Sequence, residues 1–123
     1  MPRANLEHLS LAEEQALLEF VQLLKEQLNG RIRSVLFFGS RARGEGFPDS
    51  DLDVLVVVDS DDWRVHKQIR YLAADICLKY SLNLSPRVWS ASYRREVEEL
   101  QTLLYQNIRR DGINLLKLSP ATG

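Results

Sequence analysis

The sequence has little of several features that would assign a chain to a specialised class of protein. One cysteine in 123 residues allows no internal disulfide, which excludes a small domain built on a disulfide framework. The longest apolar run is Val54 to Val58, far shorter than the roughly 20 residues that cross a bilayer. With 16 Lys and Arg against 17 Asp and Glu, the chain has no basic excess to hold a nucleic-acid backbone. We therefore expect no membrane span and no direct nucleic-acid binding.

The chain does contain enough apolar residues for one globular core. Apolar side chains make up 45% of the 123 residues, a length at which a single domain buries about two thirds of its unfolded surface. No internal repeat, low-complexity tract or linker is present, so we expect residues 1–123 to form one domain. No apolar segment follows Arg3, so we expect no secretory signal and a cytoplasmic protein.

Hydrophobic periodicity and turn residues predict alternating helices and strands. Ser10 and Glu13 match a capping box that opens a helix over Leu11 to Leu28. Buried strands are predicted at Val35 to Phe38 and Asp51 to Val58. The order α-β-β-α-β-α indicates an α/β (α+β) fold, with a small mixed sheet flanked by helices. Its remaining elements are a helix with a buried stripe from Val65 to Tyr80, a strand over Leu82 to Ser90, and a last helix carrying Val97 to Ile108.

Short features around these elements refine the predicted fold. Asp59, Asp61 and Asp62 are expected to cap the helix that follows them rather than to bind metal. Pro86 has no amide hydrogen, so the third strand is expected at an edge of the sheet or at a bulge. The apolar tail from Ile113 to Leu118 fits docking on its own domain as well as contact with another chain.

Two aspartates at the start of the second strand are the first half of a candidate catalytic motif. Asp51 and Asp53 are two residues apart, so on a strand they point to the same face, roughly 6.5 to 7 Å apart. Carboxylates placed in this way can bind Mg²⁺ ions, which prefer oxygen ligands. An Asp-x-Asp alone is more often a solvated strand end, so the assignment depends on what accompanies it.

The second half of the motif is the turn that ends the first strand. Gly39 and Ser40 precede Asp51 by a spacer of ten residues. A glycine lets backbone amides approach phosphate oxygens, and the Ser40 hydroxyl adds a donor. Arg41 and Arg43 in the spacer offer cations for a leaving pyrophosphate. The combination predicts a metal–triphosphate site.

Two other phosphate motifs fail on residue identity. A Walker A loop shares the spacing of Gly39 and Gly44, but Glu45 occupies the position that requires Lys. A dinucleotide fingerprint requires G-x-G-x-x-G at the start of a helix, and residues 39–46 do not provide it. A P-loop and a dinucleotide-binding turn are therefore excluded.

The segment GSRARGEGFPDSDLDVLVVV, from Gly39 to Val58, resembles the nucleotidyltransferases of the DNA polymerase beta superfamily, and most of all its minimal nucleotidyltransferase branch. The resemblance implies that Gly39 and Ser40 hold the nucleotide phosphates and that Asp51 and Asp53 bind Mg²⁺. It implies transfer of a nucleoside monophosphate, with ATP or another nucleoside triphosphate as substrate. Proteins of this branch act as antitoxins of HEPN-domain proteins, and some adenylylate that partner. A HEPN-domain partner is therefore expected, while the oligomeric state, a homo-oligomer included, stays open.

One departure from the family pattern leaves two hypotheses open. Active relatives carry a third carboxylate on the next strand, but Leu82 to Ser90 contains no acidic residue. Ser85 or Arg87 is expected at that position. The first hypothesis is an Mg²⁺-dependent enzyme that transfers a nucleoside monophosphate to a protein acceptor. The second is a catalytically degenerate binding module that neutralises a HEPN partner by complex formation.

Overall fold

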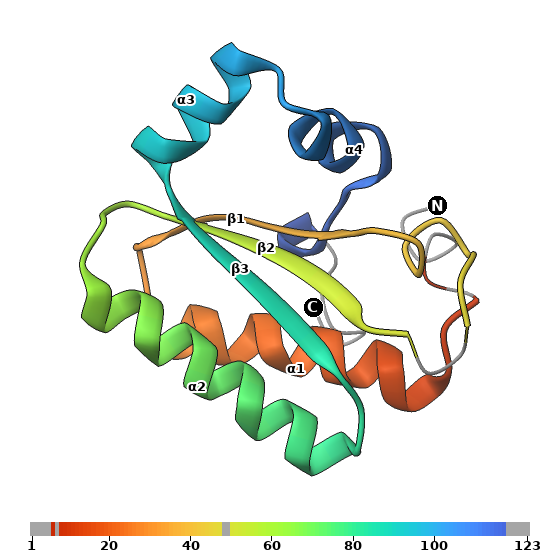
Figure 1. Cartoon of the computed structure of the whole chain (residues 1–123). Coiled ribbons are helices and arrows are strands. Elements are labelled where there is room, and N and C mark those ends of the chain that lie inside the picture. The colour runs from red at the N-terminus through yellow and green to blue at the C-terminus, as the bar shows by residue number, and fades with distance from the viewer. Residues whose placement is uncertain (1–5, 7, 48–49, 118–123) are drawn as a thin grey trace.

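The computed structural model of the chain describes residues 6, 8–47 and 50–117, which form a four-stranded mixed sheet between two layers of helices (Figure 1). The sheet order is β3-β2-β1-β4, in which β2 and β3 are parallel and the other pairs are antiparallel. The predicted α/β class and small mixed sheet are confirmed. The elements are α1 (Leu11–Gln27), β1 (Ile32–Phe38), β2 (Leu52–Val58), α2 (Trp63–Tyr80), β3 (Leu84–Ser90), α3 (Ala91–Leu100), α4 (Leu103–Asp111), β4 (Ile113–Asn114) and the 3-10 turn η2 (Leu115–Lys117).

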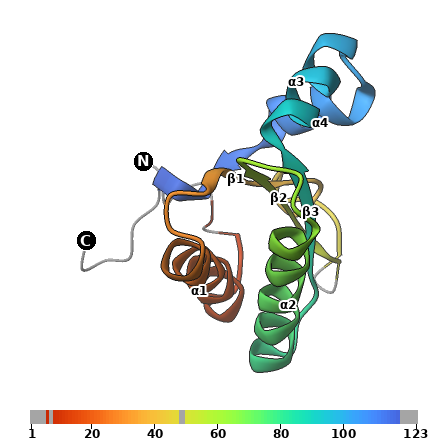
Figure 2. The same cartoon turned by 90° about the vertical axis from the view of Figure 1, so that its left-hand side faces the viewer.

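The layers follow from the alternation of side chains along β2. One set of alternate residues packs into the core shared with α1 and α2, and all its members are at most 1% exposed: Leu52, Val54, Val56 and Val58. Leu55 and Val57 point the other way, into a smaller core with Val97, Tyr105 and Ile108 of α3 and α4. Figure 2 shows the two helix pairs on opposite sides of the sheet. β2 is therefore a central strand covered on both faces, and the buried strand predicted there is confirmed.

The first two helices begin where their capping residues predict. The Ser10 hydroxyl accepts from the Glu13 amide at 3.1 Å, and the Glu13 carboxylate accepts from the Ser10 amide at 2.8 Å. Asp62 caps α2 by accepting from the Arg64 amide at 2.9 Å. Among the described residues, no helix has both the length and the apolar character needed to span a membrane.

The prediction of one last helix is wrong, because the segment folds as two helices. Gln101 ends α3 in the left-handed region with φ of 51°. The Thr102 hydroxyl then accepts from the Tyr105 amide at 3.1 Å and opens α4 in a new direction. The break leaves Leu100 75% exposed, although the predicted stripe would have buried it.

The apolar tail docks on its own domain, as one of its two predicted alternatives required. Ile113 and Asn114 pair with Phe37 and Leu36 as the edge strand β4. Leu115 follows and is fully buried in the core beneath α1 and α2. Leu118 lies outside the described residues. At the opposite edge of the sheet is β3, the position that Pro86 predicts.

Candidate functional site

The turn after β1 lies directly against the second aspartate of the motif. Antiparallel pairing matches Phe38 with Asp53, so Gly39 begins its turn beside that carboxylate. A Cβ atom placed on Gly39 would lie 2.6 Å from Asp53 Oδ2, and the φ of Gly39 is +87°. Both the space and the backbone conformation therefore require glycine here. The structure brings together Gly39 and Asp53, which the sequence separates by a long loop.

Asp53 alternates with Leu52 and Val54 and so lies on the sheet face toward α3 and α4, whereas Asp51 directly precedes β2. Asp51 is exposed and Asp53 is half-buried. Burial raises the pKa of Asp53, repulsion from Asp51 raises it further, and the Arg87 guanidinium partly offsets the shift. The Asp51 charge thus acts on Asp53, and the joint role of the two carboxylates as metal ligands stays a prediction. Such a pair binds a divalent cation favourably, because the cation relieves the repulsion.

Ser40 sits at the centre of a tightly folded loop. Its carbonyl accepts from the Glu45 amide at 2.8 Å and from the Arg43 amide at 3.1 Å. Its hydroxyl lies so close to Gly46 that an added Cβ there would be 2.7 Å from Oγ, and Gly46 also has a positive φ of +80°. Gly46 thus leaves the space that the Ser40 hydroxyl occupies, a role that loop composition alone did not reveal.

Arg41 is buried and anchors the loop to the first helix. Its Nη2 donates to Glu13 Oε2 at 2.7 Å and its Nη1 donates to the Ser50 carbonyl at 3.2 Å. The His8 imidazole bonds the Arg41 carbonyl from the other side. Arg41 is only 7% exposed. The structure gives it a structural partner, and its part in phosphate binding stays a prediction.

Arg43 has a different partner, which comes from the end of α4. Its Nη1 donates to Asp111 Oδ2 at 2.8 Å and its Nε donates to Glu45 Oε1 at 3.1 Å. Asp111 also accepts from Arg110 at 2.9 and 3.0 Å. In the sequence, Arg110 and Asp111 stand at the end of the last predicted helix, directly before Gly112. Nothing in the sequence signalled their contact with the Gly39 loop.

The register of β3 locates Ser85 and Arg87, the two residues expected at the position of a third carboxylate. Parallel pairing sets Ser85 beside Asp53 and Arg87 beside Leu55, and both lie on the face that carries Asp53. Across the described ranges, no group of three His, Cys, Asp or Glu side chains could hold a metal ion. Asp51 and Asp53 supply carboxylate oxygens, the hard ligands that Mg²⁺ prefers, and their binding of Mg²⁺ stays a prediction.

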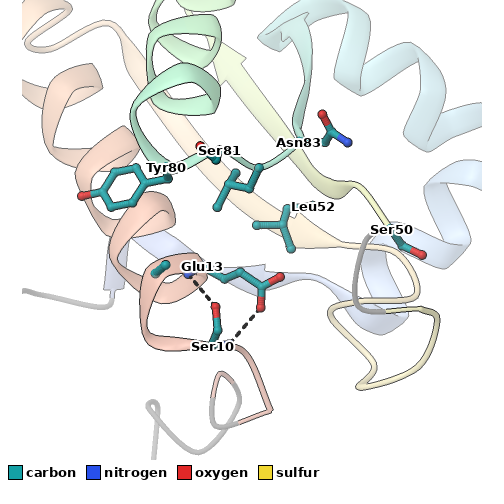
Figure 3. Close-up of a pocket in the computed structure, with 9 residues that line it drawn as sticks. Ser10, Glu13, Ser50, Leu52, Tyr80, Ser81 and Asn83 are labelled. Carbon is teal, nitrogen blue, oxygen red and sulfur yellow. Dashed lines mark hydrogen bonds between the residues drawn. The ribbon is translucent and has the colours of Figure 1, made fainter.

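A separate pocket of about 310 Å³ lies on the other face of β2 (Figure 3). Figure 3 shows the Leu52 and Glu13 side chains extending into it from β2 and α1. Because Leu52 alternates with Asp53, this pocket opens on the side of the strand that α1 and α2 cover. It lies behind the aspartate pair and is distinct from the turn at Gly39.

A four-stranded mixed sheet thus sets the Gly39–Ser40 turn against Asp53 of β2, and Asp51 directly precedes that strand, which begins one residue beyond the predicted start at Asp51. The sequence profile of the nucleotidyltransferase domain matches residues 17–113, and the chain belongs to this family. A protein of Methanocaldococcus jannaschii named as a candidate protein adenylyltransferase, MJ0604, is 36% identical over 103 residues. That match spans 76% of this chain and 98% of the relative.

Solved structures share the fold at much lower sequence identity. A mutant of the toxin–antitoxin MntA–HpeT superposes with a TM-score of 0.53 and 16% identity, covering 85% of this chain and 73% of that chain. A toxin–antitoxin structure with AMP-PNP gives a TM-score of 0.52 and 17% identity, covering 85% and 74%. These likenesses confirm the predicted fold.

Proposed function

We propose that this chain is an Mg²⁺-dependent nucleotidyltransferase that transfers AMP from ATP to a protein acceptor. The observation that carries the proposal is the close packing of the Gly39 turn on Asp53, with Asp51 beside it. A relative named as a candidate protein adenylyltransferase supports the choice of AMP and of a protein acceptor. The related fold solved with AMP-PNP supports a nucleoside triphosphate as the donor.

The proposed reaction is a substitution at the α-phosphorus of ATP. An acceptor hydroxyl oxygen forms a bond to this phosphorus and releases its proton, while the bond to the bridging oxygen breaks and pyrophosphate leaves. Ser40 donates a hydrogen bond to phosphate oxygens beside the Gly39 turn, and Arg43 offsets charge on the departing pyrophosphate. Mg²⁺ held by Asp51 and Asp53 would neutralise phosphate charge and lower the pKa of the attacking hydroxyl.

The acceptor in this proposal is a HEPN-domain partner, for which the chain serves as antitoxin. The solved structures with this fold are toxin–antitoxin proteins, which supports the pairing. The size of the domain supports it as well. The sheet and its helices use most of the described residues, so a second subunit is needed to complete the acceptor site.

The second candidate function is a binding module that neutralises the same partner without transfer. The observation in its favour is that β3 presents Ser85 and Arg87, and no carboxylate, on the face that carries Asp53. A cation at Arg87 disfavours a second metal ion on this face by like-charge repulsion. The two functions share a fold and a partner and differ only in the covalent product.

Labelled nucleotides distinguish the two functions directly. The chain and its HEPN partner are incubated with Mg²⁺ and α-labelled ATP, CTP, GTP or UTP. Asp51→Asn and Asp53→Asn remove a metal ligand, whereas Asp61→Asn, exposed beyond the far end of β2, is the matched control. Label that appears on the partner, is strongest with ATP and persists only in the control supports transfer. A stable complex without label supports the binding module.

A further inference from the structure

Beside the Gly39 turn, two arginines from distant parts of the chain converge on one carboxylate. Asp111 Oδ2 accepts from Arg43 Nη1 at 2.8 Å and from Arg110 Nη2 at 3.0 Å, and its Oδ1 accepts from Arg110 Nε at 2.9 Å. The Asp111 side chain is only 5% exposed, although Arg110 is 63% exposed and Arg43 34% exposed. The carboxylate is thus enclosed by the two guanidinium groups that it binds.

Strand pairing fixes this cluster at the catalytic end of the sheet. Ile113 pairs with Phe37 in antiparallel strands. Asp111 comes two residues before Ile113 and Gly39 two residues after Phe37, so Asp111 and Gly39 lie at the same end of these strands. Figure 1 shows α4 on the face of the sheet opposite α1 and α2, which is the face of Asp53. The cluster and the aspartate pair therefore border the Gly39 turn on one side of the sheet.

The two arginines keep donors for a further anion. A guanidinium has five N–H donors, and Asp111 engages Arg43 through one nitrogen and Arg110 through two. The Arg110 and Arg43 guanidiniums lower the pKa of Asp111 to about 2. The Asp111 carboxylate is therefore ionised at neutral pH and keeps its ion pairs with both arginines. Arg43, Arg110 and Asp111 also line an open hollow of about 490 Å³.

Glu45 competes with a further anion for the Arg43 guanidinium. It accepts from Arg43 Nε at 3.1 Å, and its side chain is 65% exposed. An exposed pair of this kind contributes little free energy and is readily exchanged for a stronger anion. A polyphosphate carries more charge than one carboxylate, so it can replace Glu45 without moving the buried Asp111.

We propose that Arg110 and Arg43, held side by side by Asp111, bind the β- and γ-phosphates of the nucleotide in the hollow beside the Gly39 turn. The inference rests on the proposed function and extends it with a residue pair from α4. Arg110 and Arg43 contact the substrate in this arrangement, whereas Asp111 is a positioning residue. Because the AMP portion lies outside this contact, the pair favours triphosphates over monophosphates.

Calorimetric titration of the full chain with ATP, ADP and AMP in Mg²⁺ tests the proposal. Arg110→Gln is expected to weaken ATP binding about tenfold and to leave AMP binding unchanged, as expected for one lost charge-assisted contact. Arg109→Gln removes the same charge from the neighbouring exposed position and is expected to match the wild type. Equal ATP affinities in the two variants would overturn the proposal.

Two further variants test the positioning role of Asp111 and the opposition of Glu45. Asp111→Asn keeps the shape but loses the charge that holds both arginines, so ATP binding and inhibition by pyrophosphate are both expected to weaken about tenfold. Glu45→Gln removes the competing carboxylate and is expected to tighten ATP binding about threefold. Arg110→Lys restores the charge without the fork and is expected to recover only part of the affinity. Unchanged pyrophosphate inhibition in Asp111→Asn would count against the arrangement.

The wild type separates this proposal from the proposed function. A wild-type chain that binds no nucleoside triphosphate, alone or with its partner, overturns both. A wild-type chain that binds ATP, together with an Arg110→Gln variant that binds it equally well, overturns only the two-arginine site. Thermal unfolding of each variant confirms that a loss of binding is not a loss of fold.

Discussion

Arg41 and Arg43 stand two residues apart in one loop, and the structure gives them opposite settings. Arg41 is 7% exposed and donates to Glu13 of α1 and to the Ser50 carbonyl. Arg43 is partly exposed and donates to Asp111 of α4 and to Glu45. Arg41 connects the loop to α1, whereas Arg43 connects it to α4 on the face of the sheet that carries Asp53.

The comparison teaches that residue type and spacing do not assign a role within a phosphate-binding loop. From the sequence, both arginines are offered as cations for the leaving pyrophosphate, with Arg43 named first. Their roles are separated by the partner that each one meets across the fold, one on each side of the sheet. The predictions below test that separation, in order of decreasing expected effect.

The largest effect is expected from Arg41→Gln on stability. The change leaves Glu13 without its cation in a largely buried position, so the free energy of unfolding should fall by about 3 kcal/mol. Urea denaturation measures it, with Arg43→Gln as the matched control. The control should lose less than about 1 kcal/mol, because Asp111 keeps its two hydrogen bonds from Arg110 and Glu45 is exposed. Equal losses in both variants would remove the distinction.

For nucleotide transfer, the larger effect is expected from Arg43→Gln rather than from Arg41→Gln. Arg43→Gln is expected to slow nucleotide transfer about 100-fold, the typical cost of removing one charge-stabilising donor from a transfer site. The rate of labelling of the partner measures it, with saturating ATP and under conditions where both proteins are folded. A rate equal to that of the wild type would assign Arg43 to loop structure alone.

Asp53 and Glu13 extend the comparison to carboxylates. Burial raises the pKa of Asp53, and repulsion from Asp51 adds to the shift, so its ionised form disfavours the folded state at neutral pH. Asp53→Asn should therefore raise the thermal midpoint slightly at pH 7 while abolishing transfer. The control Asp61→Asn should change neither quantity. A lower midpoint in Asp53→Asn would show that its charge is stabilising instead.

The smallest expected effect is the acid dependence due to Asp111. Its hydrogen bonds from Arg110 and Arg43 lower its pKa to about 2, below an unfolded value of about 3.9. A lowered pKa gives stability that is present above pH 4 and lost as the pH falls toward 2. Denaturation curves between pH 5 and 2 should be flatter for Asp111→Asn than for the wild type. Parallel curves would contradict the lowered pKa.

Local patterns account for the parts of the fold that the sequence predicted well. The capping box at Ser10 and Glu13 and the apolar strand before Gly39 act over a few residues, so spacing alone locates them. The break in the last helix was missed, because Gln101 adopts a left-handed conformation that is uncommon for residues other than glycine. The short strand at Ile113 was missed for another reason, since two residues carry no periodic signal.

The sequence by itself determined the α/β class, the Gly39–Ser40 turn and the Asp51–Asp53 pair, because alternation and motif spacing are properties of neighbouring residues. Only the tertiary structure decided that the turn packs on Asp53, that Ser85 pairs with Asp53 while Arg87 pairs with Leu55, and which arginine meets which acid. Those pairings join residues 28 and 68 positions apart. Contacts over such separations depend on how the strands register and how the helices cover each face, which no local pattern encodes.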